Sequence, residues 1–200
     1  DGFIGLSISP VDTIRVTELI ADLGINELVA PLSACELGTS VPIQILIKNF
    51  GTDTVDVKDT VFVCLEINSI LLTDTLVMAG RIIPGNTFAY TYARSSDFSL
   101  PGVYQMKLFT RYRDDYRTFN DTLSYSLEVY GYPDVDLGND TVVVAPEYLL
   151  DVTPGYFTYL WQDGSASDSF TVDQPGEGLY YVEVSDEHQC TTRDTVRVIL

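Results

Sequence analysis

Residues 156–198 read YFTYLWQDGSASDSFTVDQPGEGLYYVEVSDEHQCTTRDTVRV, and this stretch decides the fold class. Tyr159 and Trp161 are two positions apart, so their side chains share one face of an extended strand, and the same alternation recurs further along the stretch. Asp163-Gly164 and Pro175-Gly176 are turn pairs that separate such strands. Strands joined by short turns predict a small antiparallel β-sandwich.

The composition of the whole chain extends this prediction. Its 200 residues are 46% hydrophobic, enough for one large core or two small ones, and domains of about 100 residues are the commoner solution. Tyr, Phe, Thr and Val are abundant, and they favour pleated, half-buried strands over helices. We predict an all-β fold of two tandem sandwiches, residues 21–131 and 132–200. Residues 1–20 are interpreted as an extra strand or the end of a preceding domain.

The first sandwich is predicted to contain seven strands. The clearest signal comes from Ile43, Ile45 and Ile47, which alternate with more polar residues and point to one face. A sheet with one buried and one wet face requires this alternation. Gly-containing turns separate the runs. The predicted strands are residues 25–30, 41–48, 61–67, 71–78, 87–92, 103–111 and 122–130.

Four motifs in the second sandwich carry a family resemblance. They are Leu-Gly-Asn-Asp-Thr at residues 137–141, Tyr-x-Trp-x-Asp-Gly at 159–164, Gly-x-Tyr-x-Val-x-Val at 178–184 and Cys-Thr-x-x-Asp-Thr-Val at 190–196. This pattern resembles the immunoglobulin-like (PKD-type) repeats of Bacteroidota surface proteins. In those repeats the last cysteine pairs with one in the second strand, at the position that Val144 holds here. The resemblance therefore implies a free thiol at Cys190.

Five motifs in the first sandwich carry a second resemblance. They are SACELG at residues 33–38, IKNFGT at 47–52, IPG at 83–85, LPGVY at 100–104 and NDT at 120–122. They resemble the bacterial adhesion-related immunoglobulin-like module called CARDB, although Cys64 stands where that module carries an ordinary strand residue. The two resemblances cover about residues 22–198 and imply two tandem immunoglobulin-like β-sandwiches. Their motifs are turn and core signatures, which indicate architecture rather than activity.

Both resemblances imply a location on the outer surface of a bacterial cell. They point to non-catalytic stalk modules of a large adhesin or gliding-type surface filament, delivered by type IX secretion. The first four residues lack the basic start of a signal peptide, so we expect the chain to be a fragment of a longer polypeptide. The expected partners are neighbouring immunoglobulin-like modules, surface glycans or other surface-protein subunits. One alternative is an accessory carbohydrate-binding region of a secreted hydrolase. Another is a subunit that polymerises through an open sheet edge.

Charge and hydropathy exclude two classes of partner. The formal net charge is -18, which opposes binding to nucleic acid, because phosphate affinity depends on clustered Lys and Arg. No run of about 18 apolar residues is present, so direct membrane insertion is not expected. The acidity is typical of a soluble, self-repelling exported chain.

The three cysteines, Cys35, Cys64 and Cys190, leave at least one thiol unpaired. Cys35 precedes one predicted strand and Cys64 lies within another. Since connectivity cannot be read from sequence, a Cys35–Cys64 bridge and a first module without a bridge both stay open.

A repeated Asp-Thr-aliphatic triplet is the strongest chemical motif. One interpretation is purely structural: the Asp ends a turn, the Thr begins a strand and the aliphatic residue points inward. The other is modification, because the triplet resembles the Asp-Ser/Thr-aliphatic acceptor of Bacteroidota O-glycosylation. The candidate acceptors are Thr13, Thr54, Thr60, Thr75, Thr122, Thr141 and Thr195.

Two further constellations are candidate binding sites. Oxygen ligands at the predicted domain junction suit calcium, the one cofactor we consider; they are Asp134, Asp136, Asn139 and Asp140. A charged aromatic hairpin tip is a candidate contact loop for sugars; it contains Arg111, Tyr112, Arg113 and Tyr116. A solvated acidic linker and a solvated tip with weak ion pairs are the respective alternatives.

Catalysis has little support in the sequence. His188 is the single histidine and lies near Cys190 without a third orienting group, so the pair does not predict a thiol nucleophile. Zinc needs more nitrogen or sulfur ligands than these two residues provide. We therefore predict that the chain is not an enzyme.

Overall fold

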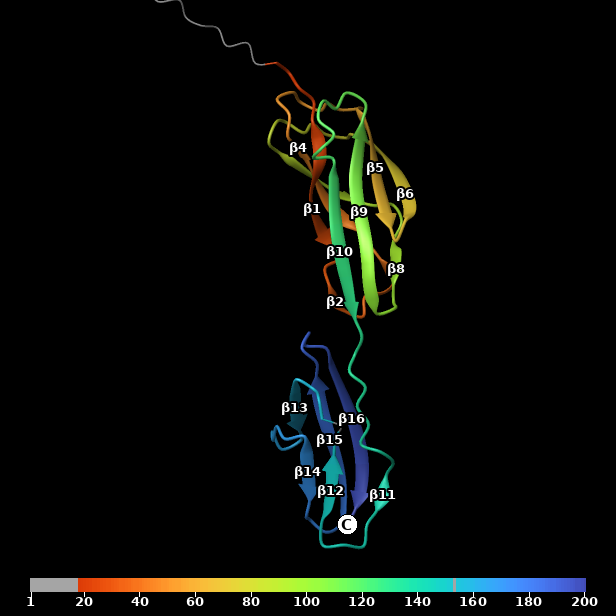
Figure 1. The fold of residues 1–200 in the computed structure, drawn as a ribbon, viewed down its shortest axis with the longest axis vertical. Helices are drawn as coiled ribbons and strands as arrows, with labels where there is room; N and C mark the ends of the chain where they lie inside the picture. Colours follow the sequence, from red (N-terminus) through yellow and green to blue (C-terminus); the bar gives the residue numbers. More distant parts are fainter. Residues whose placement is uncertain (1–17, 153) are drawn as a thin grey trace, which may run out of the picture.

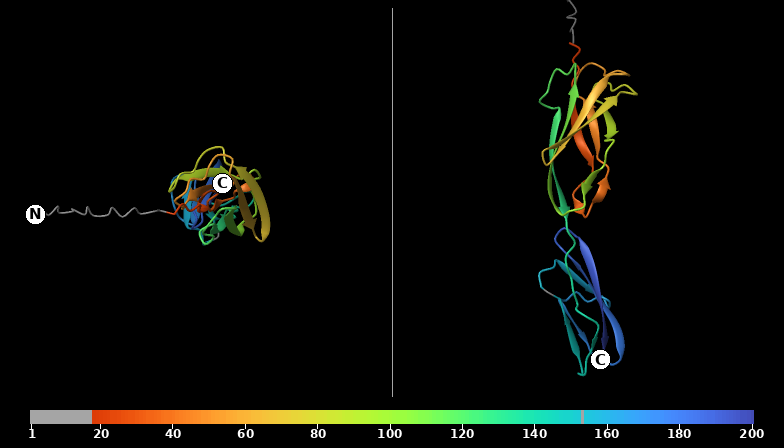
Figure 2. Two further views of the ribbon diagram at one scale, coloured as in Figure 1. Left: turned by 90° about the horizontal axis from the view of Figure 1, so that it is seen from above. Right: turned by 90° about the vertical axis from the view of Figure 1, so that its right-hand side faces the viewer.

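The computed structural model describes residues 18–152 and 154–200, which form two β-sandwiches placed end to end along one axis (Figure 1). All regular structure in these residues is β-strand, and none of them forms a helix with the length and hydropathy of a membrane span. One hydrophobic core runs from Leu23 to Val129 and a separate core from Val135 to Val198. We call the parts around these cores the first and the second module. The two modules stay aligned in perpendicular views (Figure 2).

The first module is built from two facing sheets and a short strand pair. Most pairings are antiparallel, and the parallel pairing of β2 with β10 is the exception. One sheet has the order β1 (Leu23–Ala30), β4 (Gln44–Asn49), β7 (Thr87–Thr91). The other has the order β2 (Ala34–Cys35), β10 (Thr122–Tyr130), β9 (Gly102–Tyr112), β5 (Thr60–Ile67), β6 (Ile70–Val77). The short pair is β3 (Gly38–Val41) with β8 (Ser96–Phe98).

Alternation along the strands fills the first core. Ile43, just before β4, and Ile45 and Ile47 within it are fully buried, as their spacing predicts. Val63 and Leu65 of β5 meet them from the opposite sheet. Each strand therefore contributes every second residue to one continuous core, as a half-buried sheet requires.

Asn49 explains why the Asn-Phe-Gly-Thr motif forms the tight connection after β4. This residue is fully buried, and its amide nitrogen donates to the carbonyl oxygens of Asp53 at 2.7 Å and Ile82 at 2.8 Å. Its amide oxygen accepts from the backbone N–H of Gly51 at 2.9 Å. A β-carbon at Gly51 would lie 2.1 Å from the carbonyl oxygen of Ile20, so only glycine fits there.

The second module has a four-stranded sheet and a two-stranded sheet. The order in the larger one is β11 (Thr141–Val142), β16 (Thr191–Ile199), β15 (Glu177–Ser185), β13 (Thr158–Trp161). The smaller one pairs β12 (Tyr148–Asp151) with β14 (Ser169–Val172). The parallel pairing of β11 with β16 is again the exception to antiparallel order.

Trp161 is the largest side chain in the second core. It is 1% exposed, stacks on Phe170 with ring centroids 5.2 Å apart, and donates its indole N–H to the carbonyl oxygen of Ser167 at 2.8 Å. Tyr159 and Tyr180 are half-buried at the edge of the same core. The prediction that Tyr159 and Trp161 share one face of a strand is confirmed, and this face is the one that packs on the core.

All seven strands predicted for the first module are present, and the two tandem immunoglobulin-like sandwiches are confirmed. The sequence analysis missed the short strands β2, β3 and β8, which have only two to four residues each and so no readable periodicity. Residues 1–17, including the candidate acceptor Thr13, lie outside the described residues.

Candidate functional sites

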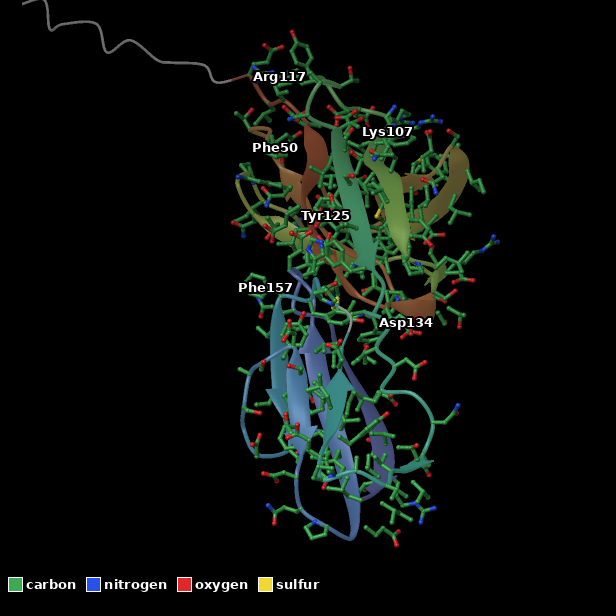
Figure 3. The ribbon with its side chains drawn as sticks, turned by 60° about the horizontal axis from the view of Figure 1, so that its bottom comes forward. Phe50, Lys107, Arg117, Tyr125, Asp134 and Phe157 are labelled. Carbon is green, nitrogen blue, oxygen red and sulfur yellow. A yellow bond between two sulfur atoms is a disulfide. The ribbon has the colours of Figure 1, made fainter. Side chains whose placement is uncertain are left out.

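A disulfide between Cys35 and Cys190 joins the two modules, and Figure 3 shows it where they meet. Parallel pairing of β2 with β10 aligns Cys35 with Tyr130, at the end of the first module that faces the second. Cys190 is buried in the turn between β15 and β16, at the facing end of the second module. The two Cα atoms are 5.7 Å apart and separated by 155 residues of chain. The junction is therefore covalent at two places: the disulfide and the linker after β10.

The turn that carries Cys190 is held by Asp186. One carboxylate oxygen of Asp186 accepts from the backbone N–H groups of His188 and Cys190, both at 2.9 Å. Gln189 completes the turn in the left-handed region, with φ 66°. This fold of the turn directs the His188 ring onto Tyr130 of the first module, with centroids 3.7 Å apart and planes 6° apart.

Tyr130 is itself fixed from its own module. Its hydroxyl donates to a carboxylate oxygen of Glu128 at 2.9 Å, and this hydrogen bond raises the pKa of Tyr130. Its carbonyl oxygen accepts from the backbone N–H of Glu36, next to the bridged Cys35, at 3.1 Å. Disulfide, aromatic stack and backbone contacts thus converge on one small area.

Of the two alternatives for the first module, the one without an internal bridge is observed among the described residues, and the other cysteine predictions are wrong. Cys35 pairs with Cys190 rather than with Cys64, and Cys190 is no free thiol. Cys64 is the free cysteine among the described residues: it lies in the middle of β5, fully buried, with the hydroxyl of Thr73 3.7 Å from its sulfur. The predicted pairing lies within one module, whereas the observed bond crosses between modules and depends on how their ends face each other. Cys190 is consequently unavailable as a nucleophile.

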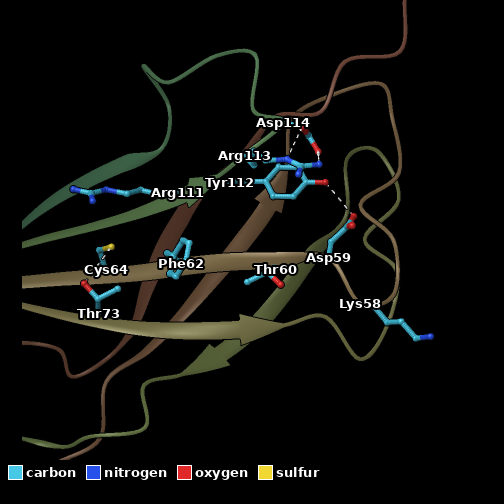
Figure 4. A pocket seen from close by; sticks show the side chains of 10 residues that line it. All are labelled: Lys58, Asp59, Thr60, Phe62, Cys64, Thr73, Arg111, Tyr112, Arg113 and Asp114. Carbon is cyan, nitrogen blue, oxygen red and sulfur yellow. Dashed lines mark hydrogen bonds and ion pairs between the residues drawn. The ribbon is translucent and has the colours of Figure 1, made fainter.

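A depression of about 870 Å³ lies on the first module across β5, β6 and β9 (Figure 4). Phe62 is 45% exposed and lies in register with Arg111 on one side and Thr75 on the other. Aromatic and aliphatic surface with a few placed polar groups is typical of ligand sites. The lining residues are Lys58, Asp59, Thr60, Phe62, Cys64, Thr73, Arg111, Tyr112, Arg113 and Asp114.

The structure brings three of the four predicted contact-loop residues to this depression. Arg111, Tyr112 and Arg113 line it, whereas the exposed Tyr116 does not. Tyr112 donates its hydroxyl to Asp59 at 3.0 Å; burial and this carboxylate raise the pKa of Tyr112 to about 12. Arg113 forms an exposed ion pair with its neighbour in sequence, and Arg111 lies over the Phe109 ring at 5.2 Å. Guanidinium groups, hydroxyls and an open aromatic ring can hold a sugar or an anionic group.

The structural interpretation of the Asp-Thr triplets holds at some of them and fails at others. Three threonines begin strands, but Thr75 and Thr195 lie in the middle of β6 and β16. The aspartates brace distant segments: Asp74 accepts from the Tyr90 hydroxyl at 3.0 Å, and Asp194 accepts from the Leu137 N–H at 2.6 Å. Of the six described candidates, Thr54 and Thr141 are half-buried. The remaining four are exposed: Thr60, Thr75, Thr122 and Thr195.

Three of the four predicted calcium ligands make other contacts. Asp140 accepts from the backbone N–H of Arg197 at 2.9 Å and forms an ion pair with its guanidinium at 3.6 Å. Asp136 accepts from the Gly138 N–H at 2.7 Å, and the carbonyl oxygen of Asp134 accepts from a tyrosine hydroxyl of the second module. Within residues 18–152 and 154–200, no three His, Cys, Asp or Glu side chains form a group that could hold a metal ion. Calcium at these positions stays a prediction.

Three carboxylates that the sequence analysis did not group meet at the other end of the first module. Asp22 is 1% exposed and accepts from the Asn120 amide at 2.7 Å; Asp115 accepts from the Leu23 N–H at 2.8 Å. Asp121 is 8% exposed, and one of its oxygens is buried with no hydrogen-bond partner among the described residues. Burial, and then the charges of Asp115 and Asp22, raise the pKa of Asp121 to about 6. No local sequence pattern links these residues. They meet because they lie next to the ends of β1, β9 and β10, which the fold brings together.

Comparison with known proteins gives distant structural likenesses only. No protein-family model and no curated protein sequence matches the chain. Similar solved structures include a CARDB domain from Pyrococcus furiosus in complex with di-metal ions, with 15% identity, TM-score 0.40, and coverage of 57% of this chain and 97% of that one. The two-domain structure of DIP-gamma IG1+IG2 has 13% identity, TM-score 0.38, and coverage of 89% and 97%.

A Ca²⁺-stabilized adhesin of an Antarctic bacterium, described as binding ice, has 13% identity and TM-score 0.37, with coverage of 92% of this chain and 50% of that one. At these scores the likenesses say nothing about ligand or partner. The sandwich assignment rests on the strand pairing itself.

Proposed function

We propose that the chain is a non-catalytic structural segment of an adhesive surface protein, in which two sandwiches act as one stiff spacer. The observation that carries this proposal is the Cys35–Cys190 disulfide beside the Tyr130–His188 stack. A linker alone leaves adjacent domains free to bend. A second covalent connection opposes that bending and suits a protein that must hold a binding end away from a surface.

The disulfide also supports an extracellular location. Stable disulfides form in oxidising compartments and are rare in the cytosol. With the net charge of -18, this supports export to the cell surface. The resemblance to Bacteroidota repeats adds the type IX route to the proposal.

A three-way comparison in the source organism tests the function. One strain carries the intact parent protein, the second lacks residues 18–200, and the third has them replaced by an unrelated sandwich pair of similar length. Antibodies against this segment should label intact cells of the first strain. A spacer predicts that deletion weakens attachment and that replacement restores it. Labelling of permeabilised cells only, or unchanged attachment after deletion, would overturn the proposal.

The depression on the first module favours a second candidate, glycan binding by an accessory module. Phe62 offers an exposed ring, and Thr60 and Arg111 line the same surface. Glycan-array binding that Phe62→Ala and Arg111→Ala both abolish would support it. The control is Leu71→Ala, an equally exposed apolar residue of neighbouring β6 outside the lining. Absence of binding to neutral and acidic glycans alike would reject this candidate.

We also propose O-glycosylation at the exposed acceptors among the Asp-Thr triplets. Thr60, Thr75, Thr122 and Thr195 leave room for a glycan because their side chains face solvent. Peptide mapping of native material should find sugar masses on these threonines before the half-buried Thr54 and Thr141. Unmodified peptides at all described acceptors would contradict the proposal.

A further inference from the structure

The disulfide changes which residues carry tension when the two ends of the chain are pulled apart. It closes a covalent loop from Cys35 to Cys190, two positions with a sequence separation of 155. The loop contains most of both cores, including Ile45 and Trp161. Because tension follows the shortest covalent route, it passes from residue 35 to residue 190 through the sulfur atoms. The residues within the loop are bypassed.

The parts of the chain outside the loop are already extended along the direction of pull. Upstream of Cys35 the route follows β1, and downstream of Cys190 it follows β16. Figure 1 shows both strands running along the long axis of the molecule, each pointing away from the N-terminal end. An extended strand rises about 3.3 Å per residue, close to the limit for a fully stretched chain. Tension along β1 and β16 therefore finds little slack to release.

Without the disulfide the route is different. Tension then leaves the first module through β10 and enters the second through residues 131–135. In the second module it pulls β11 against β16, a parallel pair with only two residue pairs in register, Thr141 with Val198 and Val142 with Ile199. Separating them also breaks the contacts that flank the pair, in which the Val143 N–H donates to the Ile199 carbonyl oxygen and the Arg197 N–H donates to Asp140. The second module opens once these contacts fail.

We propose that the Cys35–Cys190 bond is a covalent bypass that shields both sandwiches from unfolding under tension and sets the maximum length of the pair. The biological sense of this bypass rests on the proposed spacer function, whereas its mechanics follow from the covalent connectivity. The bypassed loop corresponds to about 510 to 560 Å of extended chain, from 155 residues at roughly 3.3 to 3.6 Å each.

Single-molecule force spectroscopy on the 200-residue chain, with handles at both ends, tests the bypass. The oxidised chain should release no segment of hundreds of ångströms. After reduction, or in the Cys35→Ser/Cys190→Ser double variant, the fully extended chain should be about 510 to 560 Å longer. Cys64→Ser is the matched control, because Cys64 is the free cysteine among the described residues and should leave the oxidised record unchanged.

Two outcomes would overturn the bypass. One is release of several hundred ångströms by a chain whose Cys35–Cys190 bond is verified by non-reducing peptide mapping. The other is equal final length of oxidised and reduced chains. Circular dichroism of the double variant confirms that both modules still fold before pulling. The attachment experiment is independent: it can fail while the bypass holds, and the bypass can fail in a protein that still acts as a spacer.

Discussion

The two modules share one architecture but differ in how their cores are filled. Among the described residues, the first core contains eighteen buried hydrophobic residues, and Phe98, its largest fully buried side chain, is one of many that fill it. The second core contains nine buried hydrophobic residues. One is Trp161, and the other eight are valine or leucine. Small domains bury a smaller fraction of their surface and are closer to the limit of stability. The second module therefore depends more on single contacts and on its junction with the first.

The largest expected effect is a loss of stability on truncating a core side chain, and it should differ between the two modules. Trp161→Ala removes the main side chain of the small core and should cost about 3 to 5 kcal/mol, enough to unfold the second module at moderate temperature. Calorimetry should show loss of one transition while the first module melts normally. Phe98→Ala is the matched change in the large core, where the first module should keep a lowered transition. An unchanged second transition in Trp161→Ala would remove the basis of the comparison.

The junction is the next largest contribution. Reducing the disulfide, or replacing both cysteines by serine, should destabilise the pair by about 2 to 4 kcal/mol, because the bond restricts the unfolded chain. The smaller module should lose more, so that the two melting transitions move apart. Calorimetry with and without reductant measures this. Adding reductant to the double-serine variant is the control, because that variant has no disulfide to reduce. Equal shifts of both transitions would show that the second module depends on the junction no more than the first module does.

Asp121 should make the stability of the first module depend on pH. Its pKa in the folded protein is raised to about 6 from an ordinary 3.8, so its stabilising contribution is complete below about pH 3.8 and is lost as pH rises through 6. Asp121→Asn carries no charge and should stabilise the first module above pH 6, on the order of 1 to 2 kcal/mol, with little effect near pH 3.5. Melting curves across this range measure the difference. A variant that is equally destabilised at every pH would contradict the assignment.

The smallest effect concerns the aromatic contact across the junction. Removing the Tyr130–His188 stack should cost about 0.5 to 1.5 kcal/mol of coupling between the modules. A double-mutant cycle with Tyr130→Ala and His188→Ala isolates this term. Tyr132→Ala is the control, because Tyr132 is exposed and joins no aromatic pair among the described residues. Additive single effects would leave the disulfide as the main connection.

Much of the fold could be predicted from local sequence. Ile43, Ile45 and Ile47 are buried as their spacing predicts, and Trp161 is the centre of the second core. The turn at Asp163-Gly164 forms as expected, with Gly164 at φ 86° and its N–H donating to the Trp161 carbonyl oxygen at 2.9 Å. These features depend on residues within a few positions of one another, and strand period and turn chemistry are local properties.

The candidate sites could be predicted from the sequence only in part. Arg111, Tyr112 and Arg113 were predicted as a contact loop from their residue types, but the depression they line also needs β5 and β6. The seven triplets were visible in the sequence, whereas the use of Asp74 and Asp194 as braces between distant segments was not. Periodicity shows which face a residue occupies, and it does not show which distant residue lies opposite.

The sequence by itself determined the two sandwiches, the seven longer strands of the first module and core residues such as Ile45 and Trp161, since alternation and turns are encoded within short stretches. Only the tertiary structure decided that Cys35 pairs with Cys190 and that Tyr130 stacks on His188. It also decided that Asp22, Asp115 and Asp121 share one end of the first module. The physical reason is distance along the chain: partners separated by up to 155 residues meet because whole strands and modules are placed side by side.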